Sequence, residues 1–460
     1  MIKNKASIIN NGLTVKQRQL RKDLCTVLES VLFDIDPYRL VKQNLALSKG
    51  QLTIGSVLNL DLSKYQNIYV VGAGKAVYKM ALAVEDLLGR RIASGFINVP
   101  VLPQDNKLKL IKIHKARHPI PDSQGVYGTK QIKKLLLWAN KQDLIIAVMS
   151  GGGSALMPLP AAGISLRDKI KVTSLLLRTS ATIHEINVVR KHLSQIKGGQ
   201  FASLAYPATV VALYISDIVD DPFDIQASGP TAPDPSTFED AVKILKRHGV
   251  WKLIPRSVSN RLVRGQKGLI SETPGPDHEV FSKGRVYNFT IGNHNTALVA
   301  AARSARKLGY NCLELTSSIQ GEAREISKVI VAIGKHIQRY GKPLTKPALV
   351  IAGGETTVQV RGKGLGGRNQ ELVLSAIPQI GDGMAILSFG TDGIDGITPK
   401  PVAGAIADLA TKARATARKL NWDDYLDNNN SYNFFKKAGG HLYTGPTGTN
   451  VGDLILLGVV

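Results

Sequence analysis

The sequence predicts an α/β protein of two α/β/α domains with mainly parallel sheets. Short apolar runs recur along the chain and end in glycine-rich or acidic turns, and segments with the helical spacing of apolar residues lie between them. Strands that alternate with helices in this way form parallel sheets covered on both faces. A length of 460 residues is enough for two or three domains. Hydrophobic residues at 43% and charged residues at 20% are the balance of a globular protein.

The amino-terminal half supplies the first set of elements. Apolar spacing predicts helices over residues 16–33 and 37–47. A buried strand, a glycine turn and an amphipathic helix then follow one another at residues 67–71, 72–74 and 75–88. Two more apolar strands, which lead into a glycine turn and an acidic loop, are expected at residues 143–150 and 208–216. We therefore expect a Rossmann-like α/β domain over residues 15–245.

The carboxyl-terminal half repeats the pattern. A helix is expected over residues 295–308, and apolar strands are expected at residues 288–292, 348–354 and 384–390. Between the halves, residues 246–285 are basic, rich in glycine and proline and poor in apolar periodicity, which is typical of a linker or an exposed excursion. We therefore place a second α/β domain at residues 286–460.

The chain carries a large positive charge. Lysine and arginine total 59 against 35 acidic residues, which gives a formal net charge of +24. Such a charge would suit nucleic acid, a membrane surface or an anionic substrate. Aromatic residues make up only 6% of the chain and do not interleave with the basic run at residues 241–268. A platform for single-stranded nucleic acid would require such interleaving. We therefore expect a solvated basic surface and no nucleic-acid partner.

Several other classes of protein are disfavoured. The two cysteines, Cys25 and Cys312, lie far apart, which argues against structural zinc and against a disulfide. No apolar run approaches the length of a membrane span, and the first residues lack the apolar core of a signal peptide. We therefore expect a cytoplasmic protein without membrane contact. A homodimer is one assembly compatible with the sequence, which does not determine the oligomeric state.

The distinctive motifs follow the predicted strands. Ligands of parallel α/β sheets bind beyond the carboxyl ends of the strands, where loops and helix starts offer backbone N–H groups to anions. Lys75 follows Gly74 at the start of a helix, in a turn that matches neither a P-loop nor the GxGxxG fingerprint. A bound anion would offset the unfavourable contact of this lysine with the helix dipole. The alternative is a lysine that is only exposed to solvent.

Consecutive glycines follow the strand at 143–150. They cost conformational entropy unless the backbone must approach another group closely. We interpret this stretch as a cradle for a phosphate or a nucleotide, with a tight turn as the alternative. Its residues are Ser150, Gly151, Gly152, Gly153 and Ser154, and a weaker version of the motif is formed by Gly353, Gly354 and Glu355.

Two acidic loops also follow apolar strands. The first contains Asp217, Asp220, Asp221 and Asp224 in an acid-poor chain. Like charges close together are unfavourable without a cation, and Mg²⁺ is usually held by one or two carboxylates together with phosphate oxygens and water. We assign Asp217, nearest to the strand, to such a site, whereas the other three fit a polar loop equally well. Asp392 and Asp395, the two carboxylates of the second loop, suit a general base or a metal ligand.

Arg368 opens a helix after a glycine-rich stretch. Its planar and permanently charged guanidinium suits a phosphate or a carboxylate. His118 could orient a substrate, although an ordinary loop histidine fits its position better. Lysine, arginine and aspartates beside glycine loops, without a Ser-His-Asp arrangement, are what phosphoryl transfer requires, because that reaction depends on positioning and charge neutralisation.

These motifs together resemble the class II glycerate kinase family, whose carboxyl-terminal portion is the MOFRL domain. On this resemblance the MOFRL region would span residues 346–458. The matching blocks follow one another along nearly the whole chain and are VVGAGKA (70–76), HPIPD (118–122), MSGGGSAL (149–156), NVVRKHLSQIKGG (187–199), ASGPTAPDPST (227–237), GGET (353–356), GGRNQEL (366–372), TDGIDG (391–396) and GPTGTNVGDL (445–454).

The resemblance implies transfer of the γ-phosphoryl group of ATP to a hydroxyl of D-glycerate, with Mg²⁺ as cofactor and 2-phosphoglycerate as product. Lys75 and Arg368 would stabilise the charge on the transferring group. Asp217 and Asp392 would serve as metal ligand or base. Further residues would bind substrate or nucleotide in an active-site cleft between the domains, namely Asn187, Arg190, Lys191, Lys197 and Asn369.

The chain departs from the family pattern at three places, which puts the shape of this cleft in question. Asp220 stands where the family has glycine, Gly452 stands where asparagine is expected, and residues 397–401 are additional. Two alternative functions remain open. One is a hydroxypyruvate reductase, a label the family has carried, against which the imperfect GxGxxG patterns argue. The other is a basic protein that binds nucleic acid.

Overall fold

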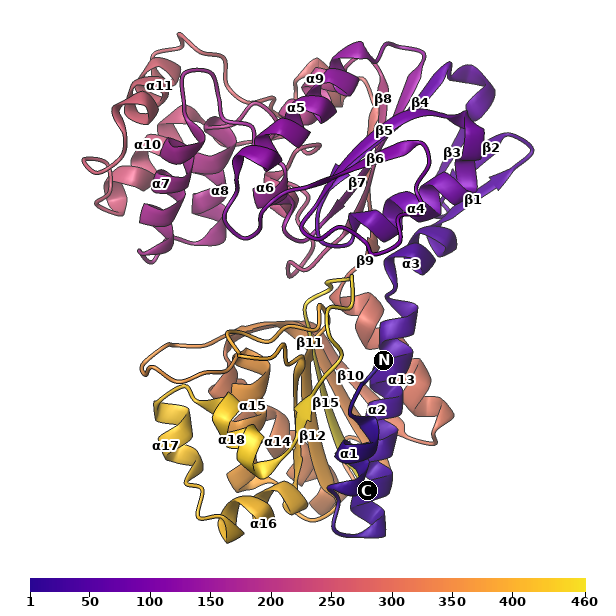
Figure 1. Cartoon of the computed structure of the whole chain (residues 1–460), viewed down its shortest axis with the longest axis vertical. Coiled ribbons are helices and arrows are strands. Elements are labelled where there is room, and N and C mark those ends of the chain that lie inside the picture. Colours follow the sequence, from indigo (N-terminus) through magenta and orange to yellow (C-terminus); the bar gives the residue numbers. More distant parts are fainter. The chain divides into compact units, whose positions relative to one another are not determined.

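The computed structural model describes all 460 residues, and the chain divides into two compact units. Unit 1 comprises Met1–Asp36, Asp217–Asp220 and Gly292–Val460, and unit 2 comprises Pro37–Ser216 and Asp221–Ile291. Each unit contains a six-stranded sheet with helices packed against it (Figure 1). The predicted α/β class is therefore confirmed. None of the helices combines the length and the apolar character needed to cross a bilayer.

Unit 2 is built on a mainly parallel sheet. The unit contains the strands β1 (Leu45–Ser48), β2 (Gln51–Ile54), β3 (Leu58–Asp61), β4 (Asn67–Ala73), β5 (Ile92–Val99), β6 (Ile111–Lys115), β7 (Asp143–Ser150), β8 (Thr209–Ile215) and β9 (Val286–Gly292), whose last residue falls in unit 1. Strands β1 to β3 form a separate antiparallel sheet, and β4 to β9 form the six-stranded sheet. Its helices are α3 (Pro37–Asn44), η1 (Leu62–Lys64), α4 (Val77–Leu88), η2 (Gly89–Arg91), α5 (Ser123–Trp138), α6 (Gly153–Leu156), α7 (Leu166–Leu177), α8 (Ile183–His192), α9 (Gln200–Ala205), η3 (Gln226–Ser228), α10 (Phe238–Arg247), α11 (Arg256–Gln266) and α12 (Glu279–Ser282).

The strand order of this sheet locates a ligand site. The strands lie in the order β6-β5-β4-β7-β8-β9, and those from β6 to β8 are parallel. The sheet therefore grows in one direction from β4 and in the opposite direction from β7. The crevice beyond the carboxyl ends of two such strands is where parallel α/β sheets bind their ligands. β4 ends at Ala73 and β7 ends at Ser150, so the two predicted glycine loops meet at this point.

Helices cover both faces of the central sheet of unit 2 (Figure 1). On one face, Ala147 and Met149 of β7 pack in a single core with Ile132 of α5 and Phe201 of α9. On the other face, α4 packs against β5 and β7. Every residue of β7 is buried, which explains why this strand is a continuous apolar run rather than an alternating one.

Residues 246–285 do not form the expected linker. They contain α11 and α12, and α11 joins a small second core with α7, α8 and α10. Val258 and Leu262 of α11 pack in this core with Phe238, and a Cβ atom at Gly265 would lie only 2.2 Å from the ring of Phe238. The two apolar residues are one helical turn apart, and the basic residues around them conceal the period in the sequence.

Unit 1 is built on a sheet of different topology. Its strands are β10 (Asn311–Glu322), β11 (Ala348–Thr357), β12 (Met384–Gly390), β13 (Gly404–Asp408), β14 (His441–Leu442) and β15 (Asp453–Val459). Its helices are α1 (Lys5–Asn10), α2 (Val15–Asp34), α13 (His294–Lys307), α14 (Ala323–Tyr340), α15 (Arg368–Ala376), η4 (Ile377–Gln379), α16 (Leu409–Ala417), α17 (Trp422–Asp427) and α18 (Ser431–Ala438).

The expectation of mainly parallel sheets fails for unit 1. The strand order is β10-β11-β15-β12-β13-β14. Among the neighbouring pairs, β10 and β11 are parallel and the other four pairs are antiparallel. A helix, α14, connects these two strands, as a parallel pair requires, whereas β12 and β13 are joined without one. A strand covered on both faces has the same apolar sequence whatever its direction, so the apolar runs could not distinguish the two arrangements.

The domain boundaries differ from the expected ones at both ends. Residues 15–36 belong to unit 1, where α2 and α13 cover the face of the sheet opposite α14 and α15 (Figure 1). Arg21 of α2 forms a buried ion pair with Asp408 at the end of β13, with 2.6 Å between Nη2 and Oδ1. Conversely, β9, expected in the second domain, adds to the sheet of unit 2 beside β8. In both cases a segment packs against residues that are far away in the sequence. Local sequence patterns do not reveal such contacts.

Candidate active site

The two glycine loops of unit 2 are tied together beyond β4 and β7. The backbone N–H of Lys75 donates to the carbonyl oxygen of Gly151 (2.9 Å), and the Ser150 hydroxyl accepts from the backbone N–H of Ala76 (3.0 Å). Gly74 has a φ of +154°, and a Cβ atom there would lie 2.1 Å from Ser150 Oγ. Gly74 and Ser150 therefore hold the loops together and fix the start of α4 next to Lys75.

Lys75 and His118 both flank Gly152. A Cβ atom at Gly152 would lie 3.0 Å from His118 Cδ2 and 3.5 Å from Lys75 Cγ, and the φ of Gly152 is +85°. Any side chain at position 152 would thus be strained and would crowd both neighbours. The absence of a side chain at position 152 leaves room between Lys75 and His118. His118 therefore lies beside the glycine loop, whereas the sequence favoured an ordinary loop role for it.

A pocket of about 440 Å³ opens at this place, within the range of small-molecule sites. Its walls include Pro119, Ile120 and Leu177. Its lining contains five residues that the sequence analysis predicted or considered, namely His118, Gly152, Ser154, Arg190 and Lys197. It also contains three polar residues that the sequence did not single out, namely Lys169, Thr173 and Ser174. No aspartate or glutamate lines this pocket. The basic, acid-free lining is therefore suited to an anion, and the apolar walls are suited to the carbon skeleton of an organic molecule.

A hydrogen-bond chain organises the polar side of this pocket. Ser154 Oγ lies 2.8 Å from Ser228 Oγ, which donates to Asn187 Oδ1 (3.0 Å). Arg190 donates to the same Asn187 oxygen at 3.4 Å. Lys197 Nζ donates to the carbonyl oxygen of Ala227 (3.0 Å). The segment at Ala227 and Ser228 thus brings together four predicted residues, namely Ser154, Asn187, Arg190 and Lys197. In the sequence analysis this segment was only part of a block that resembles the family.

This organising segment is conformationally unusual. Ala227 and Ser228 have positive φ values of 50° and 65° without being glycine. Left-handed backbone at non-glycine residues is unfavourable and clusters at functional sites, where surrounding contacts hold it in place. Lys191, in contrast, is buried in ion pairs with Asp234 (3.2 Å) and Asp224 (3.4 Å) and does not line the pocket. Its contacts are those of a structural residue.

Unit 1 contains a second polar centre, around Arg368 at the start of α15. Arg368 forms ion pairs with Asp453 (Nε to Oδ2, 2.6 Å) and with Glu355 (Nη1 to Oε1, 2.8 Å). Asn369 donates to Asp453 (3.0 Å) and to Asp395 (3.3 Å). Burial raises the pKa of Asp453 to about 6, against the opposing effect of Arg368. Asp395 was considered from the sequence without being assigned a role, whereas Asp453, in the family block at residues 445–454, was not singled out.

The two carboxylates predicted to hold magnesium lie in unit 1. Asp217 accepts a hydrogen bond from Asn450 Nδ2 (2.6 Å), and the carbonyl oxygen of Asp392 accepts from the backbone N–H of Thr447 (3.2 Å). Both aspartates therefore contact the loop at residues 445–452. No group of three or more His, Cys, Asp or Glu side chains is arranged to hold a metal ion. Two carboxylates suit Mg²⁺, because this ion keeps waters and phosphate oxygens as its other ligands.

The glycine-rich stretch before Arg368 is held by asparagines rather than shaped for a dinucleotide. Asn429 Oδ1 accepts from the backbone N–H groups of Arg361 (2.6 Å) and Gly362 (3.0 Å). A Cβ atom at Gly362 or at Gly364 would lie 2.3 Å or 2.4 Å from Asn428. These glycines therefore allow close packing against residues 428–430, which explains why this stretch is rich in glycine.

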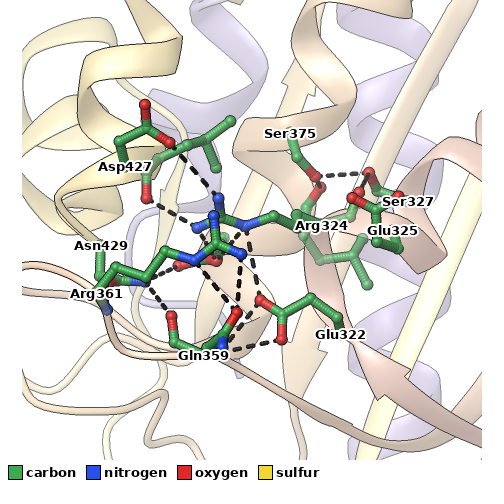
Figure 2. Close-up of polar contacts among 12 residues, drawn as sticks. Glu322, Arg324, Glu325, Ser327, Gln359, Arg361, Ser375, Asp427 and Asn429 are labelled. Carbon is green, nitrogen blue, oxygen red and sulfur yellow. Dashed lines mark hydrogen bonds and ion pairs between the residues drawn. The ribbon is translucent and has the colours of Figure 1, made fainter.

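The same loop is anchored to a charged cluster, which Figure 2 shows. Arg324 on α14 donates to Glu371 Oε1 (2.8 Å) and to the carbonyl oxygen of Leu426 (2.9 Å). Asn429 donates to the other oxygen of Glu371 (3.1 Å). Glu371 lies one turn after Arg368 on α15, so the cluster connects the glycine-rich loop to the helix that presents Arg368.

The glycines of β11 have a structural explanation. Gly354 has a φ of +151°, and a Cβ atom there would lie 2.2 Å from the carbonyl oxygen of Ile319 on β10. Gly353 and Gly354 are buried within the strand, and Glu355 projects to pair with Arg368. Of this predicted motif, only Glu355 reaches the polar centre of unit 1.

Comparisons with known proteins agree with this organisation. Residues 23–263 match the model of a domain of unknown function (DUF4147), and residues 348–453 match the MOFRL family. The chain is 40% identical to a glycerate 2-kinase of Pyrococcus horikoshii, over 92% of this chain and 93% of that protein. It is 39% identical to a D-glycerate 2-kinase of Thermotoga maritima, over 95% of this chain and 98% of that protein. The crystal structure of a glycerate kinase from Thermotoga maritima superimposes with a TM-score of 0.83 at 38% identity, covering 96% of this chain and all of that one.

Proposed function

The chain belongs to the glycerate kinase family with a MOFRL carboxyl-terminal domain, and from this premise we propose that it transfers the γ-phosphoryl group of ATP to the 2-hydroxyl of D-glycerate. The product would be 2-phosphoglycerate, and the reaction would require Mg²⁺. The observation that carries the proposal is the grouping of Ser154, Arg190 and Lys197 around one acid-free pocket beside Lys75. Such a grouping of cations suits phosphoryl transfer, which consists mainly of positioning and charge neutralisation.

In this proposal the cationic side chains act on the transferring group. Lys75, held at the start of α4, and Arg368, held between Glu355 and Asp453, stabilise the negative charge on the phosphoryl oxygens in the transition state. Fixed ion pairs preorganise the guanidinium, so little reorganisation is needed during the reaction. Ser154 and the backbone of the adjacent glycine loop orient the bound anion.

The carboxylates have a separate task. Asp217 would hold magnesium, which when bound neutralises charge on the phosphate oxygens, and Asp392 would serve as a second ligand or as the base. The carboxylate that does not coordinate the ion can accept the proton of the 2-hydroxyl of the acceptor. Asn450 orients Asp217 through its hydrogen bond.

Turnover with defined acceptors tests this proposal. ADP release is measured with ATP and D-glycerate, L-glycerate or other 2-hydroxy acids, with and without Mg²⁺. We expect magnesium-dependent ADP release that is greatest with D-glycerate. In parallel, oxidation of NADH by hydroxypyruvate is followed to test the reductase alternative. NADH oxidation without ADP release would overturn the proposal, as would ADP release that no 2-hydroxy acid stimulates.

A further inference from the structure

Three basic side chains converge on the pocket of unit 2 from different elements. Lys169 comes from α7, Arg190 from α8, and Lys197 from the segment after α8. Lys169 and Lys197 are 6% and 1% exposed. Lys169 Nζ is buried and has no hydrogen-bond partner, whereas Lys197 Nζ donates only to a backbone carbonyl. The cluster therefore concentrates three basic groups in a place shielded from water.

This arrangement is unfavourable in the protein by itself. Burial, together with the positive charges of Arg190 and Arg261, lowers the pKa of Lys169 to about 7. The pKa of Lys197 is also well below its ordinary value, because of burial and of the charges of Lys169 and Arg190. Buried charged groups are normally paired, and an unpaired one is costly. The pocket lining contains no carboxylate, so a bound anion would supply the negative charge that the protonated forms of these groups lack.

We propose that Lys169, Arg190 and Lys197 form a subsite for the phosphate groups of an organic phosphate. This inference rests on the proposed function and names the ligand class of one part of its site. Three cations exceed what the single carboxylate of D-glycerate would neutralise, whereas a nucleotide or a phosphorylated acid carries several negative charges. The pocket volume of about 440 Å³ and the apolar walls at Pro119, Ile120 and Leu177 also favour a ligand with an organic body.

The subsite has a consequence that a purely structural cluster would lack. A bound phosphate supplies the negative charge that the protonated form of Lys169 lacks, so binding raises the pKa of this lysine again. Near neutral pH the protein therefore takes up a proton when an organic phosphate binds. The other groups that face Lys169, which are Arg190, Arg261 and Lys197, are all basic.

Calorimetric titration of the full chain tests the subsite without turnover. ADP, 2-phosphoglycerate and D-glycerate are titrated separately into the wild-type protein and into Lys169→Met, Lys169→Arg and Lys171→Met variants. Lys171 lies on the same helix and is exposed, so its replacement is the matched control. Each titration is repeated at pH 7 in two buffers of different ionisation enthalpy, because proton uptake makes the measured enthalpy depend on the buffer.

We expect Lys169→Met to weaken at least one of the two phosphate-bearing ligands tenfold or more and D-glycerate less than twofold. Lys169→Arg should retain binding but lose the proton uptake, because arginine is protonated before the ligand arrives. If ADP loses affinity, the nucleotide is the source of the phosphate, and if 2-phosphoglycerate does, the product is. Unchanged affinity for both in a Lys169→Met protein of wild-type thermal stability would overturn the inference, as would a loss confined to D-glycerate.

The outcomes also separate this inference from the proposed function. Lysine-dependent binding of an organic phosphate in a protein that does not phosphorylate D-glycerate would leave the subsite standing and refute the proposed function. Phosphorylation of D-glycerate by a protein whose phosphate binding is independent of Lys169 would support the proposed function and refute the subsite. If Lys169→Met does not fold, the buffer-dependent enthalpy of the wild-type protein and of Lys169→Arg decides, and its absence in the wild-type protein overturns the inference.

Discussion

Asn450 donates a hydrogen bond from Nδ2 to Asp217 Oδ2 across 2.6 Å, although the two residues are 233 positions apart in the chain. Asp217 directly follows the strand region of unit 2 but belongs to unit 1, together with the loop that carries Asn450. This bond helps to fix the orientation of the Asp217 carboxylate. It therefore links the acidic loop to the carboxyl-terminal family block in one candidate metal site.

The first prediction concerns magnesium. Asp217→Asn should raise the magnesium concentration needed for half-maximal activity, because one anionic ligand is lost. Asn450→Ala should shift it in the same direction by about tenfold, since residues that orient metal ligands contribute on that scale. The measurement is initial rate against magnesium concentration, with Asp277→Asn as an exposed control. An unchanged magnesium dependence in Asp217→Asn would move the site to Asp392.

The second prediction concerns Lys75. Lys75→Ala should lower kcat by about a hundredfold, as expected for the loss of one group that stabilises the transition-state charge. The fold should persist, because backbone and Ser150 contacts hold the loop. Steady-state kinetics and thermal unfolding are compared with those of Lys130→Ala, an exposed substitution on α5. Turnover close to that of the control would show that Lys75 has no catalytic role.

The third prediction is a pH dependence that originates at Asp453. With its pKa raised to about 6 by burial, Asp453 is ionised above that pH and protonated below it. Protonation removes the charge that holds Arg368 through the Nε contact, so the wild-type kcat should fall as pH decreases through about 6. Asp453→Asn should be slower above pH 6 and should lack this decline, whereas the exposed Asp382→Asn should keep it. A pH profile of Asp453→Asn that retains the decline would assign it to another group.

The fourth prediction concerns the cluster in Figure 2. Arg324→Met leaves Glu371, whose side chain is only 3% exposed, without its ionic partner. The free energy of unfolding should decrease by about 3 kcal/mol, the scale for breaking a buried ion pair from one side. Replacing both residues, as Arg324→Met with Glu371→Gln, should recover part of this loss. Urea unfolding of the two single variants and the double variant measures the coupling, and strictly additive effects would show that the pair is not coupled.

The loops that carry chemistry were predictable because their signal is local. Each follows an apolar strand, and the positions of Lys75, Ser154 and Arg368 at strand ends or helix starts depend only on that succession. The α/β class and the strands β4, β7 and β8 of unit 2 follow from the same pattern. Lys169 gave no such signal, because a lysine on an amphipathic helix is usually exposed, and its burial results from packing against α8 and α11.

The topology of unit 1 and the domain boundaries depend on long-range contacts. The antiparallel pairing of β15 with both β11 and β12 leaves no trace in apolar runs that are buried on both faces. The ion pair of Arg21 with Asp408 joins α2 to a strand end more than three hundred residues later. Asp395 and Asp453 were present in predicted blocks, but only the fold shows that both contact Asn369.

The most direct test of the central claim is the identity of the product. After incubation with ATP, Mg²⁺ and D-glycerate, the proton-coupled phosphorus NMR spectrum of the reaction mixture distinguishes the two hydroxyl positions. A phosphate on C2 couples to one methine proton and gives a doublet, whereas a phosphate on C3 couples to two methylene protons and gives a triplet. We predict a doublet that grows in step with ADP. A triplet, or ADP without any new phosphate ester, would contradict phosphoryl transfer to the 2-hydroxyl of D-glycerate.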